Sequence, residues 1–418
     1  MITLIEALNY RCLRYVRRPL RPFQVLVGPN ASGKTTFLDV IAFLGKLVSD
    51  GLDSAVTERA QQFRDLVWQH AGNSFELAVQ AKVPETMRDS IFSSEYTDIR
   101  YEVMIGESEN EYVILEEKVL FIKPRNDTGT NQRSLFPYLP DPPQTIMTRK
   151  GSRNAKVIIN KKRGGNDNYY SEKVRDAGKS WAPSFRLGPR KSAFGNLVDD
   201  AERFPVSTWF REYLSTGVQS VMLNSVKLRQ MSAPGQGKGF ATDGANLPWV
   251  IEDFKKSHPE QFKRWVMHLR TALPDIQDIS TEVQPDTNHR YLKIKYAGGL
   301  EVPSWVVSDG TLRMLALTLP AYLPDYFGVF LVEEPENGIH PRAVETVFQS
   351  LSSVYKAQVM LATHSPIVLN MAALEDVLCF AKTSDGATDI VAGTEHPKLR
   401  DWQSSIELGT LLASGVLG

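Results

Sequence analysis

The eight residues from Gly28 to Thr35 have the types and spacing that bind the phosphates of a nucleotide. They read GPNASGKT and match the pattern G-x-x-x-x-G-K-[ST] at every fixed position. In this pattern backbone N–H groups wrap around phosphate oxygens, the lysine reaches the outer phosphates and the threonine hydroxyl coordinates magnesium. We therefore predict a nucleotide site in which Lys34 contacts phosphate and Thr35 contacts Mg2+. The residues expected to contact the nucleotide are Gly28, Pro29, Asn30, Ala31, Ser32, Gly33, Lys34, Thr35 and Thr36.

Two acids and a histidine follow two short apolar stretches far along the chain. Val329–Val332 precedes Glu333 and Glu334, and Val359–Ala362 precedes a Thr-His-Ser triplet that contains His364. Both stretches predict buried strands, and ligands gather at the carboxyl ends of parallel strands. One acid at such an end can hold magnesium and a second can orient the attacking water. We expect Glu333 to serve the metal, Glu334 to act as catalytic base, and His364 to contact the γ-phosphate or that water.

The residues around the phosphate loop predict the elements that must hold it. Phe23–Val27 reads as a buried strand, and Phe37, Leu38, Ile41 and Leu44 share one face of a helix that follows the loop. A strand, a glycine-rich loop and a helix in this order are the context in which the phosphate-binding pattern acts.

The stretch VSDGTLRMLALTLP, residues 307–320, predicts another helix start. Ser308 or Asp309 is a suitable N-cap, and Leu312, Leu315 and Leu319 recur at helical spacing. Free N–H groups at a helix start form an anion site. Capped helix starts are common, so this motif by itself assigns no function.

Composition limits the classes of protein that the chain can belong to. Of 418 residues 42% are hydrophobic, and 48 Lys and Arg balance 48 Asp and Glu. This balance argues against a strongly basic protein that coats DNA. The two cysteines, Cys12 and Cys379, do not suggest a disulfide framework. The start of the chain lacks a signal-peptide core and no apolar run approaches the ~20 residues of a membrane helix, so we expect a cytoplasmic protein without a membrane partner.

The middle of the chain combines strand and helix patterns. Residues 75–83 alternate, Tyr101–Ile105 repeats the pattern, Phe262–Leu269 marks an amphipathic helix and 290–297 reads as a strand. There is no heptad run of useful length, so no long coiled coil is expected. The predicted units are the N-terminal part of a head at 1–125, an insertion at 126–289 and the C-terminal part of the head at 290–418.

One segment, residues 149–191, breaks the charge balance. It holds thirteen Lys or Arg and three Asp or Glu, with Tyr169, Tyr170 and Trp181 among them. Basic side chains neutralise phosphates and aromatic rings stack on bases, so the segment could contact nucleic acid. The alternative is a solvated loop on the insertion, and composition leaves both open.

Four motifs in order, GPNASGKTT, SDGTLRMLAL, FLVEEPENGIHP and ATHSP, resemble the ABC-type ATPase heads of the SMC and RecF class. The closest resemblance is to stand-alone AAA-type ATPases related to the OLD (overcoming lysogenization defect) family. The resemblance implies an α/β head with a mixed sheet, flanking helices and an antiparallel β lobe, here with an α+β insertion. It also implies ATP and Mg2+ as the ligands.

In this class the signature serine caps the γ-phosphate of ATP held by a second subunit, and two heads close over two ATP molecules. The resemblance therefore implies that Ser308, Asp309 and Gly310 act in trans within a homodimer. A transporter signature would read Leu-Ser-Gly-Gly, whereas here Asp309 intervenes. Arg11 lies in an N-terminal hairpin where related heads place a basic residue near the phosphates. Further candidates are Arg14 and Arg313 for nucleotide contact, and Gln69 or Gln80 for the Q-loop.

The resemblance implies a dimeric switch ATPase that controls a separate effector protein in antiviral defence or toxin control. One alternative is a RecF-like DNA-repair ATPase that acts at gaps or ends. Others are the nucleotide-binding subunit of a transporter, and a scaffold that binds ATP without hydrolysis, against which Glu334 argues. OLD-type proteins carry a nuclease domain after the histidine strand, and we expect none in residues 365–418. The apolar tail is expected to pack on the head or to dock a partner.

Overall fold

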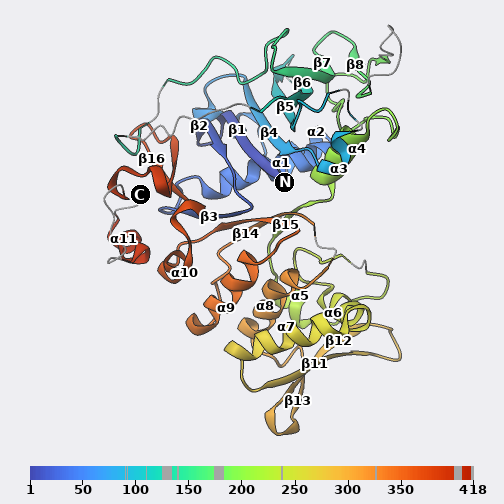
Figure 1. Ribbon diagram of the computed structural model, residues 1–418, viewed down its shortest axis with the longest axis vertical. Helices are drawn as coiled ribbons and strands as arrows, with labels where there is room; N and C mark the ends of the chain where they lie inside the picture. The colour runs from blue at the N-terminus through green and yellow to red at the C-terminus, as the bar shows by residue number, and fades with distance from the viewer. Residues whose placement is uncertain are drawn as a thin grey trace.

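The computed structural model describes residues 1–89, 91, 93–109, 111–124, 134–138, 141–173, 183–236, 239–324, 327–399 and 407–415. These residues form three β-sheets with helices between and around them (Figure 1). In Figure 1 an antiparallel sheet lies at the top, a mostly parallel sheet crosses the middle and a small third sheet reaches the lower tip. Within these ranges, no helix has the length and apolar character needed to cross a membrane.

The upper sheet is the antiparallel lobe that the alternating sequence patterns predict. Its strand order is β2-β1-β4-β5-β6-β7-β8-β9. Strand β4 (Ser74–Lys82) contains most of the alternating stretch 75–83, and β5 (Asp98–Ser108) contains Tyr101–Ile105. The other strands are β1 (Ile2–Tyr10), β2 (Leu13–Pro19), β6 (Glu111–Ile122), β7 (Ala155–Lys162), β8 (Asp167–Tyr169) and β9 (Ser184–Phe185).

The central sheet brings together the three predicted buried strands. Its order is β10-β14-β15-β3-β16-β17, and every pair is parallel except β16 with β17. The predictions of strands at 23–27, 329–332 and 359–362 are confirmed by β3 (Phe23–Val27), β14 (Gly328–Glu333) and β15 (Ala357–Ala362). The other strands are β10 (Val218–Val221), β16 (Val377–Lys382) and β17 (Thr388–Ala392).

Two apolar cores form because both faces of the central sheet are covered. Helix α1 (Lys34–Asp50) lies between this sheet and the upper one, so Leu26, Leu331 and Met360 join the same core as its apolar face. The alternate strand residues, among them Phe330, point into a second core with the helices below. Strands buried on both faces read as continuous apolar runs, which is why these stretches lack alternation. Shorter helices beside α1 are α2 (Leu52–Thr57), α3 (Glu85–Arg88) and α4 (Pro205–Ser215).

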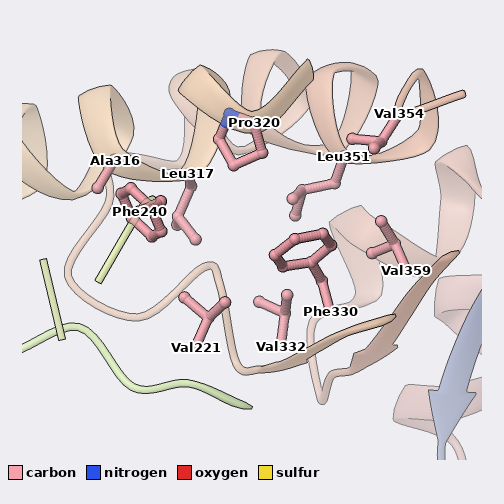
Figure 2. A pocket seen from close by; sticks show the side chains of 10 residues that line it. All are labelled: Val221, Phe240, Ala316, Leu317, Pro320, Phe330, Val332, Leu351, Val354 and Val359. Carbon is pink, nitrogen blue, oxygen red and sulfur yellow. The ribbon is translucent and has the colours of Figure 1, made fainter. Parts of the chain in front are cut away.

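The lower face of the central sheet packs against α8 (Asp309–Thr318) and α9 (Pro341–Ser352). Figure 2 shows Leu317 of α8 and Leu351 of α9 facing Phe330 and Val332 of β14 around a small cavity. Every residue that lines this cavity is apolar, so it offers no hydrogen bonds to water. This packing fixes the start of α8 relative to the strand that ends at Glu333.

Below these helices a third sheet completes the lower lobe. It contains β11 (Ile276–Val283), β12 (Arg290–Tyr296) and β13 (Glu301–Pro303). The amphipathic helix predicted at Phe262–Leu269 is confirmed, because its apolar residues are buried in α7 (Pro259–Ala272). Helix α6 (Leu247–Ser257) lies beside α7, and α5 (Ser225–Arg229) lies beside α8. The segment predicted as an insertion, 126–289, contributes at least one strand to each of the three sheets.

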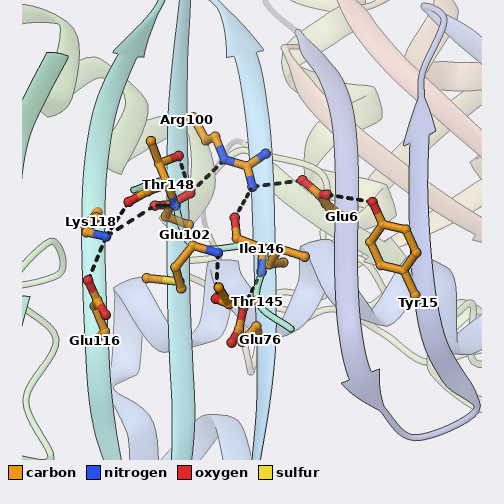
Figure 3. A network of polar contacts seen from close by, with 11 residues as sticks. Glu6, Tyr15, Glu76, Arg100, Glu102, Glu116, Lys118, Thr145, Ile146 and Thr148 are labelled. Atoms are coloured by element: carbon orange, nitrogen blue, oxygen red, sulfur yellow. Dashed lines mark hydrogen bonds and ion pairs between the residues drawn. The ribbon is translucent and has the colours of Figure 1, made fainter. Parts of the chain in front are cut away.

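The outer face of the upper sheet is polar yet buried. Residues 145–148, which we call the strap, cross this face (Figure 3). Arg100 lies 2.8 Å from Glu6 and 2.9 Å from Glu102, whose side chain is fully buried. Strap backbone N–H groups donate to Glu76 and Glu102, each at 2.7 Å. Buried charges are tolerated when they are paired and hydrogen-bonded, and the strap supplies those partners.

The described part of the tail packs on the head. Helix α11 (Leu408–Ala413) follows Glu407, whose carboxylate accepts a 2.6 Å hydrogen bond from Asn370 in α10 (Pro366–Met371). Leu408 is buried in the lower core. The tail is expected to pack on the head or to dock a partner, and these residues pack on the head. Val416 and Leu417 lie outside the described residues.

Glu172 joins the upper sheet to helix α4. Its two carboxylate oxygens accept 2.8 Å hydrogen bonds from the backbone N–H groups of Val206 and Ser207, in the first turn of α4. The side chain is 0% exposed. Burial raises the pKa of Glu172 from 4.5 to about 7, and the hydrogen bonds offset this only in part.

The raised pKa of Glu172 makes stability depend on pH. The folded state holds this proton more tightly than the unfolded state, so the contribution to stability is full below pH 4.5 and is lost as pH rises through about 7. Across that pH window the free energy of unfolding of the wild type should fall by about 3 kcal/mol, and Glu172→Gln should not show this fall. Urea unfolding of wild type and variant between pH 4.5 and 7.5 measures it. Glu202→Gln, at an exposed side chain, is the control. Equal pH slopes in wild type and Glu172→Gln would contradict the expectation.

Candidate functional site

The phosphate loop connects β3 to α1 and is held by strands β16 and β17. Gly28 has φ 150° and Gly33 has φ 100°. A Cβ on Gly28 would lie 2.3 Å from the carbonyl oxygen of Phe380, and one on Gly33 would lie 2.2 Å from Thr388 Oγ1. Both glycines are therefore required by space as well as by backbone angle. The loop is closely covered on this side.

Lys34, the first residue of α1, is buried at the phosphate loop. Its Nζ donates to the carbonyl oxygens of Gly28 at 2.8 Å and Pro29 at 2.9 Å. Burial lowers the pKa of Lys34 to about 8, although Glu334 and Glu333 raise it. The ammonium thus lies over the loop with only backbone carbonyls as hydrogen-bond partners. Nucleotide phosphates would give it stronger, charged partners.

Thr35 and Glu333 meet although they are far apart in sequence. Thr35 Oγ1 donates to Glu333 Oε2 at 2.5 Å, joining the start of α1 to the end of β14. Hydroxyl and carboxylate oxygens are suitable ligands for Mg2+, which usually takes one or two protein ligands and fills its other positions with phosphate and water. The residues present therefore fit the predicted metal, which Thr35 and Glu333 would hold.

Glu334 and His364 face each other at the same edge of the sheet. Glu334 Oε1 lies 3.8 Å from His364 Nε2, and the other carboxylate oxygen accepts a hydrogen bond from Asn337. Glu334 has φ 47°, and its N–H donates to Ala362 O at 2.8 Å. A left-handed conformation is uncommon for a residue with a side chain and is typical of functional sites. Both predicted side chains line one pocket with the phosphate loop.

Cys12 completes this pocket, and no pattern in the sequence predicts it there. It lies in the turn between β1 and β2, and its Sγ is 3.1 Å from where a Cβ on Gly33 would be. The nucleotide pocket, as we call it from here, has this lining: Cys12, Asn30, Ala31, Ser32, Gly33, Lys34, Thr35, Thr36, Glu333, Glu334, Ala362 and His364. Asn337, which binds Glu334, was also missed. Asn337 lies three residues after Glu334, and this short spacing is the signal in the sequence for a contact within one loop.

Arg11 lies beside the nucleotide pocket and does not line it. Its guanidinium is 3.5 Å from Asp39 and donates to Arg59 O at 2.9 Å. Together with Thr35 and Glu333 it lines an adjoining hollow. Arg11 is therefore on the metal side of the site and already has acidic and carbonyl partners.

The other basic and glutamine candidates lie outside the nucleotide pocket. Arg14 pairs with Asp385 at 3.4 Å, and Gln69 donates to Asp385 O at 3.2 Å. Gln80 belongs to β4, where it pairs with Leu4 and Arg100 in the upper sheet. No Q-loop role is supported for either glutamine by these contacts.

The signature residues start α8 as predicted, away from the nucleotide pocket. Ser308 is the N-cap and accepts from Thr311 N at 3.2 Å. Asp309 binds Arg313 at 2.8 Å, which gives Arg313 a partner within its own helix. A Cβ on Gly310 would lie 2.6 Å from the carbonyl oxygen of Gly338. Ser308 is exposed at the surface, so its helix start is open to an anion from elsewhere.

The basic segment 149–191 has fewer side chains available to contact nucleic acid than its composition suggests. Lys161 is 4% exposed and binds Asp167 at 2.8 Å. Tyr169 is buried and donates to Ala193 O, so it cannot stack on a base. Arg163 and Arg190 pair with acids of the head, Glu109 and Asp53. Trp181 lies outside the described residues.

Comparison with known proteins places the chain in a family. Residues 23–370 match the family described as "AAA domain, putative AbiEii toxin, Type IV TA system". The chain therefore belongs to this AAA-domain family, and it has the fold of an SMC head. A search of curated proteins by sequence finds no match.

Solved SMC heads share the fold. The structure of an SMC head bound to the C-winged helix domain of ScpA matches with TM-score 0.50 and 13% identity, over 93% of this chain and 97% of that chain. The Pyrococcus furiosus Smc head with an extended coiled coil gives TM-score 0.49 and 13% identity, over 93% and 95%. The Thermotoga maritima SMC head gives 0.39 and 12%, over 94% and 98%. The first likeness confirms the predicted head fold.

Nucleotide affinity should depend on the charge of Lys34. Phosphates favour the ammonium, so binding takes up a proton above the free pKa of about 8. Affinity for ATP should be constant from pH 7 to 8 and fall roughly tenfold per pH unit above that. Calorimetry between pH 7 and 9.5, in buffers of different ionisation enthalpy, measures both effects. Lys46→Gln, on the same helix, should keep the pH dependence. Equal affinity at pH 7 and 9.5 would show that Lys34 does not bind phosphate through its charge.

Cys12 can report nucleotide in the pocket. Cys379 is fully buried with a pKa raised by burial to about 12, so N-ethylmaleimide should modify Cys12 alone. Magnesium and ATP at about ten times the Kd should slow modification roughly tenfold, because few sites remain free. Mass spectrometry follows the reaction, with Cys12→Ser as the unmodified control. A rate that ATP does not change would place the nucleotide elsewhere.

Proposed function

We propose that this chain is an ATP-hydrolysing switch that works as a dimer of heads and controls a separate effector protein. The proposal rests on where the predicted functional side chains lie in the structure. Lys34, Thr35, Glu333, Glu334 and His364 line one pocket, whereas Ser308 starts a helix outside it. Such a chain holds a nucleotide but needs a second copy to enclose it.

The residues of the pocket have distinct proposed roles. Lys34 binds the outer phosphates and, when Mg2+ is bound, Thr35 and Glu333 hold this ion, which supplies positive charge to the β- and γ-phosphate oxygens. Glu334 accepts a proton from the attacking water, with its carboxylate fixed by Asn337. His364 lies on the other side of that carboxylate and orients the water or the γ-phosphate. Asn30 to Gly33 and Thr36 complete the phosphate contacts.

The second copy supplies the signature. Ser308, Asp309 and Gly310 form an exposed helix start whose N–H groups and positive dipole end favour an anion. The γ-phosphate on a partner head is the anion we propose. Two such contacts related by a twofold axis close the dimer around two ATP molecules.

Control of an effector protein is proposed because of the limited change that ATP hydrolysis in the pocket can produce. Hydrolysis changes only the contact between heads, so a cellular effect needs another protein. The family description names a toxin system, and the similar SMC head is described as bound to a domain of another protein. The family description supports toxin control, and the SMC head supports a partner protein. Antiviral defence rests on the resemblance of the motifs, and Mg2+ and ATP are the proposed ligands. In segment 149–191, Lys161 pairs with Asp167 of the same segment, and Arg163 and Arg190 pair with acids of the head, which makes a RecF-like DNA site the weaker alternative.

A mixing experiment tests the shared site. Lys34→Ala and Ser308→Arg should each abolish turnover alone, since each spoils both sites of its own dimer. An equimolar mixture should recover about a quarter of wild-type turnover, because half the dimers are mixed and each has one intact site. A steady-state ATPase assay with Mg2+ measures it.

The control is Lys34→Ala mixed with the Lys34→Ala/Ser308→Arg double variant, which should stay inactive. Glu334→Gln should bind ATP without hydrolysing it and accumulate as an ATP-dependent dimer in light scattering. Normal turnover of Ser308→Arg, or no recovery on mixing, would refute the shared site while leaving ATP binding intact.

A further inference from the structure

Glu336 joins the two strand ends that carry Glu334 and His364. It lies on the loop after β14, two residues beyond Glu334. Its Oε1 accepts a 2.6 Å hydrogen bond from Thr363 Oγ1 and a 3.2 Å hydrogen bond from the backbone N–H of His364. Thr363 Oγ1 in turn accepts from Ser365 N at 2.9 Å. This oxygen thus binds two residues of the turn after β15, and the Thr363 N–H also donates to Leu26 O at 3.1 Å.

The second oxygen of Glu336 makes the contact unusual. Oε2 is buried and has no hydrogen-bond partner among the described residues. Burying a carboxylate oxygen without a partner is unfavourable. Such a group next to reacting residues indicates a role in their geometry.

Glu334 is fixed independently of Glu336. Its backbone N–H bonds to Ala362 O at 2.8 Å and its carboxylate is held by Asn337. Among the described residues, the His364 side chain approaches the loop after β14 only at Glu334, where Nε2 lies 3.8 Å from Oε1. The Glu336 hydrogen bonds join the turn that carries His364 directly to the loop that carries Glu334.

We propose that Glu336 is a positioning residue that sets His364 at working distance from Glu334 and from the water between them and the γ-phosphate. The inference rests on the proposed function, because it assigns Glu336 a part in the same hydrolytic site. Glu336 does not touch the nucleotide pocket itself, and it acts through the backbone of His364.

Kinetics of matched variants test the proposal. Glu336→Leu has similar size without an acceptor, and should lower kcat for ATP roughly 10- to 100-fold. KM should change by less than about twofold, because the contact matters in the transition state. Glu336→Gln keeps a carbonyl oxygen for Thr363 and His364 N–H and should restore kcat to within about threefold of wild type.

A double-variant cycle separates positioning from general damage to the fold. Glu336→Leu/His364→Ala should be no slower than His364→Ala alone, because Glu336 acts only through His364. Multiplying losses would overturn the proposal, as would wild-type kcat in Glu336→Leu or an equal loss in Glu336→Gln. If Glu336→Leu does not fold, Thr363→Val replaces it in the same cycle, with the same expectation and the same overturning result.

A measurement without turnover distinguishes this proposal from the proposed function. The ring resonance of His364, assigned with His364→Ala, should shift when magnesium and the non-hydrolysable analogue AMP-PNP are added. Glu336→Leu should bind the analogue with unchanged affinity and lose that shift, and an unchanged shift would overturn the positioning role. A wild type that shows the shift but never hydrolyses ATP would refute the ATPase and leave the positioning role standing.

Discussion

The parallel pairing of β14, β15 and β3 is the constraint on which the site depends. Glu333 is level with Ala362, and Ala362 is level with Leu26. The residues that follow the three strands therefore emerge at one edge, although Thr35 and Glu333 are 298 positions apart. A slip of one residue in either pairing would exchange the two faces of a strand between the two cores. The apolar residues on both faces prevent this slip. The packing that buries them therefore also fixes the geometry of the pocket.

The pocket gathers opposite charges that the protein alone does not fully satisfy. Lys34 is buried and bonded to carbonyls, and Glu333 bonds to a hydroxyl. Glu334 keeps a left-handed backbone that would relax in an ordinary loop. Each of these groups would gain a stronger partner from a phosphate, a divalent ion or a water. A nucleotide with its ion would relieve these local costs, while apolar contacts elsewhere supply the stability of the head.

The sequence predicts what depends on neighbours along the chain and misses what depends on distant packing. The phosphate loop, the three buried strands, the Ser308 cap and helix α7 follow from spacing and apolar pattern. Cys12 enters the pocket only because a hairpin turn lies over Gly33. A stretch of basic residues likewise reads as a free positive surface until the fold gives Lys161 a buried partner. The strap and its charged network were missed because alternation indicates which face of a strand is polar, but not what covers it.

The place of β3 in the central sheet has a consequence for synthesis on the ribosome. Strand β3 is at residues 23–27, yet its neighbours are β15 at 357–362 and β16 at 377–382. The phosphate loop lies against Phe380 and Thr388, so it takes its final shape only after those residues have left the exit tunnel. For most of translation the strand has both edges unpaired, a condition that slows folding and favours aggregation or binding by chaperones. The phosphate loop is therefore completed late in the life of the nascent chain.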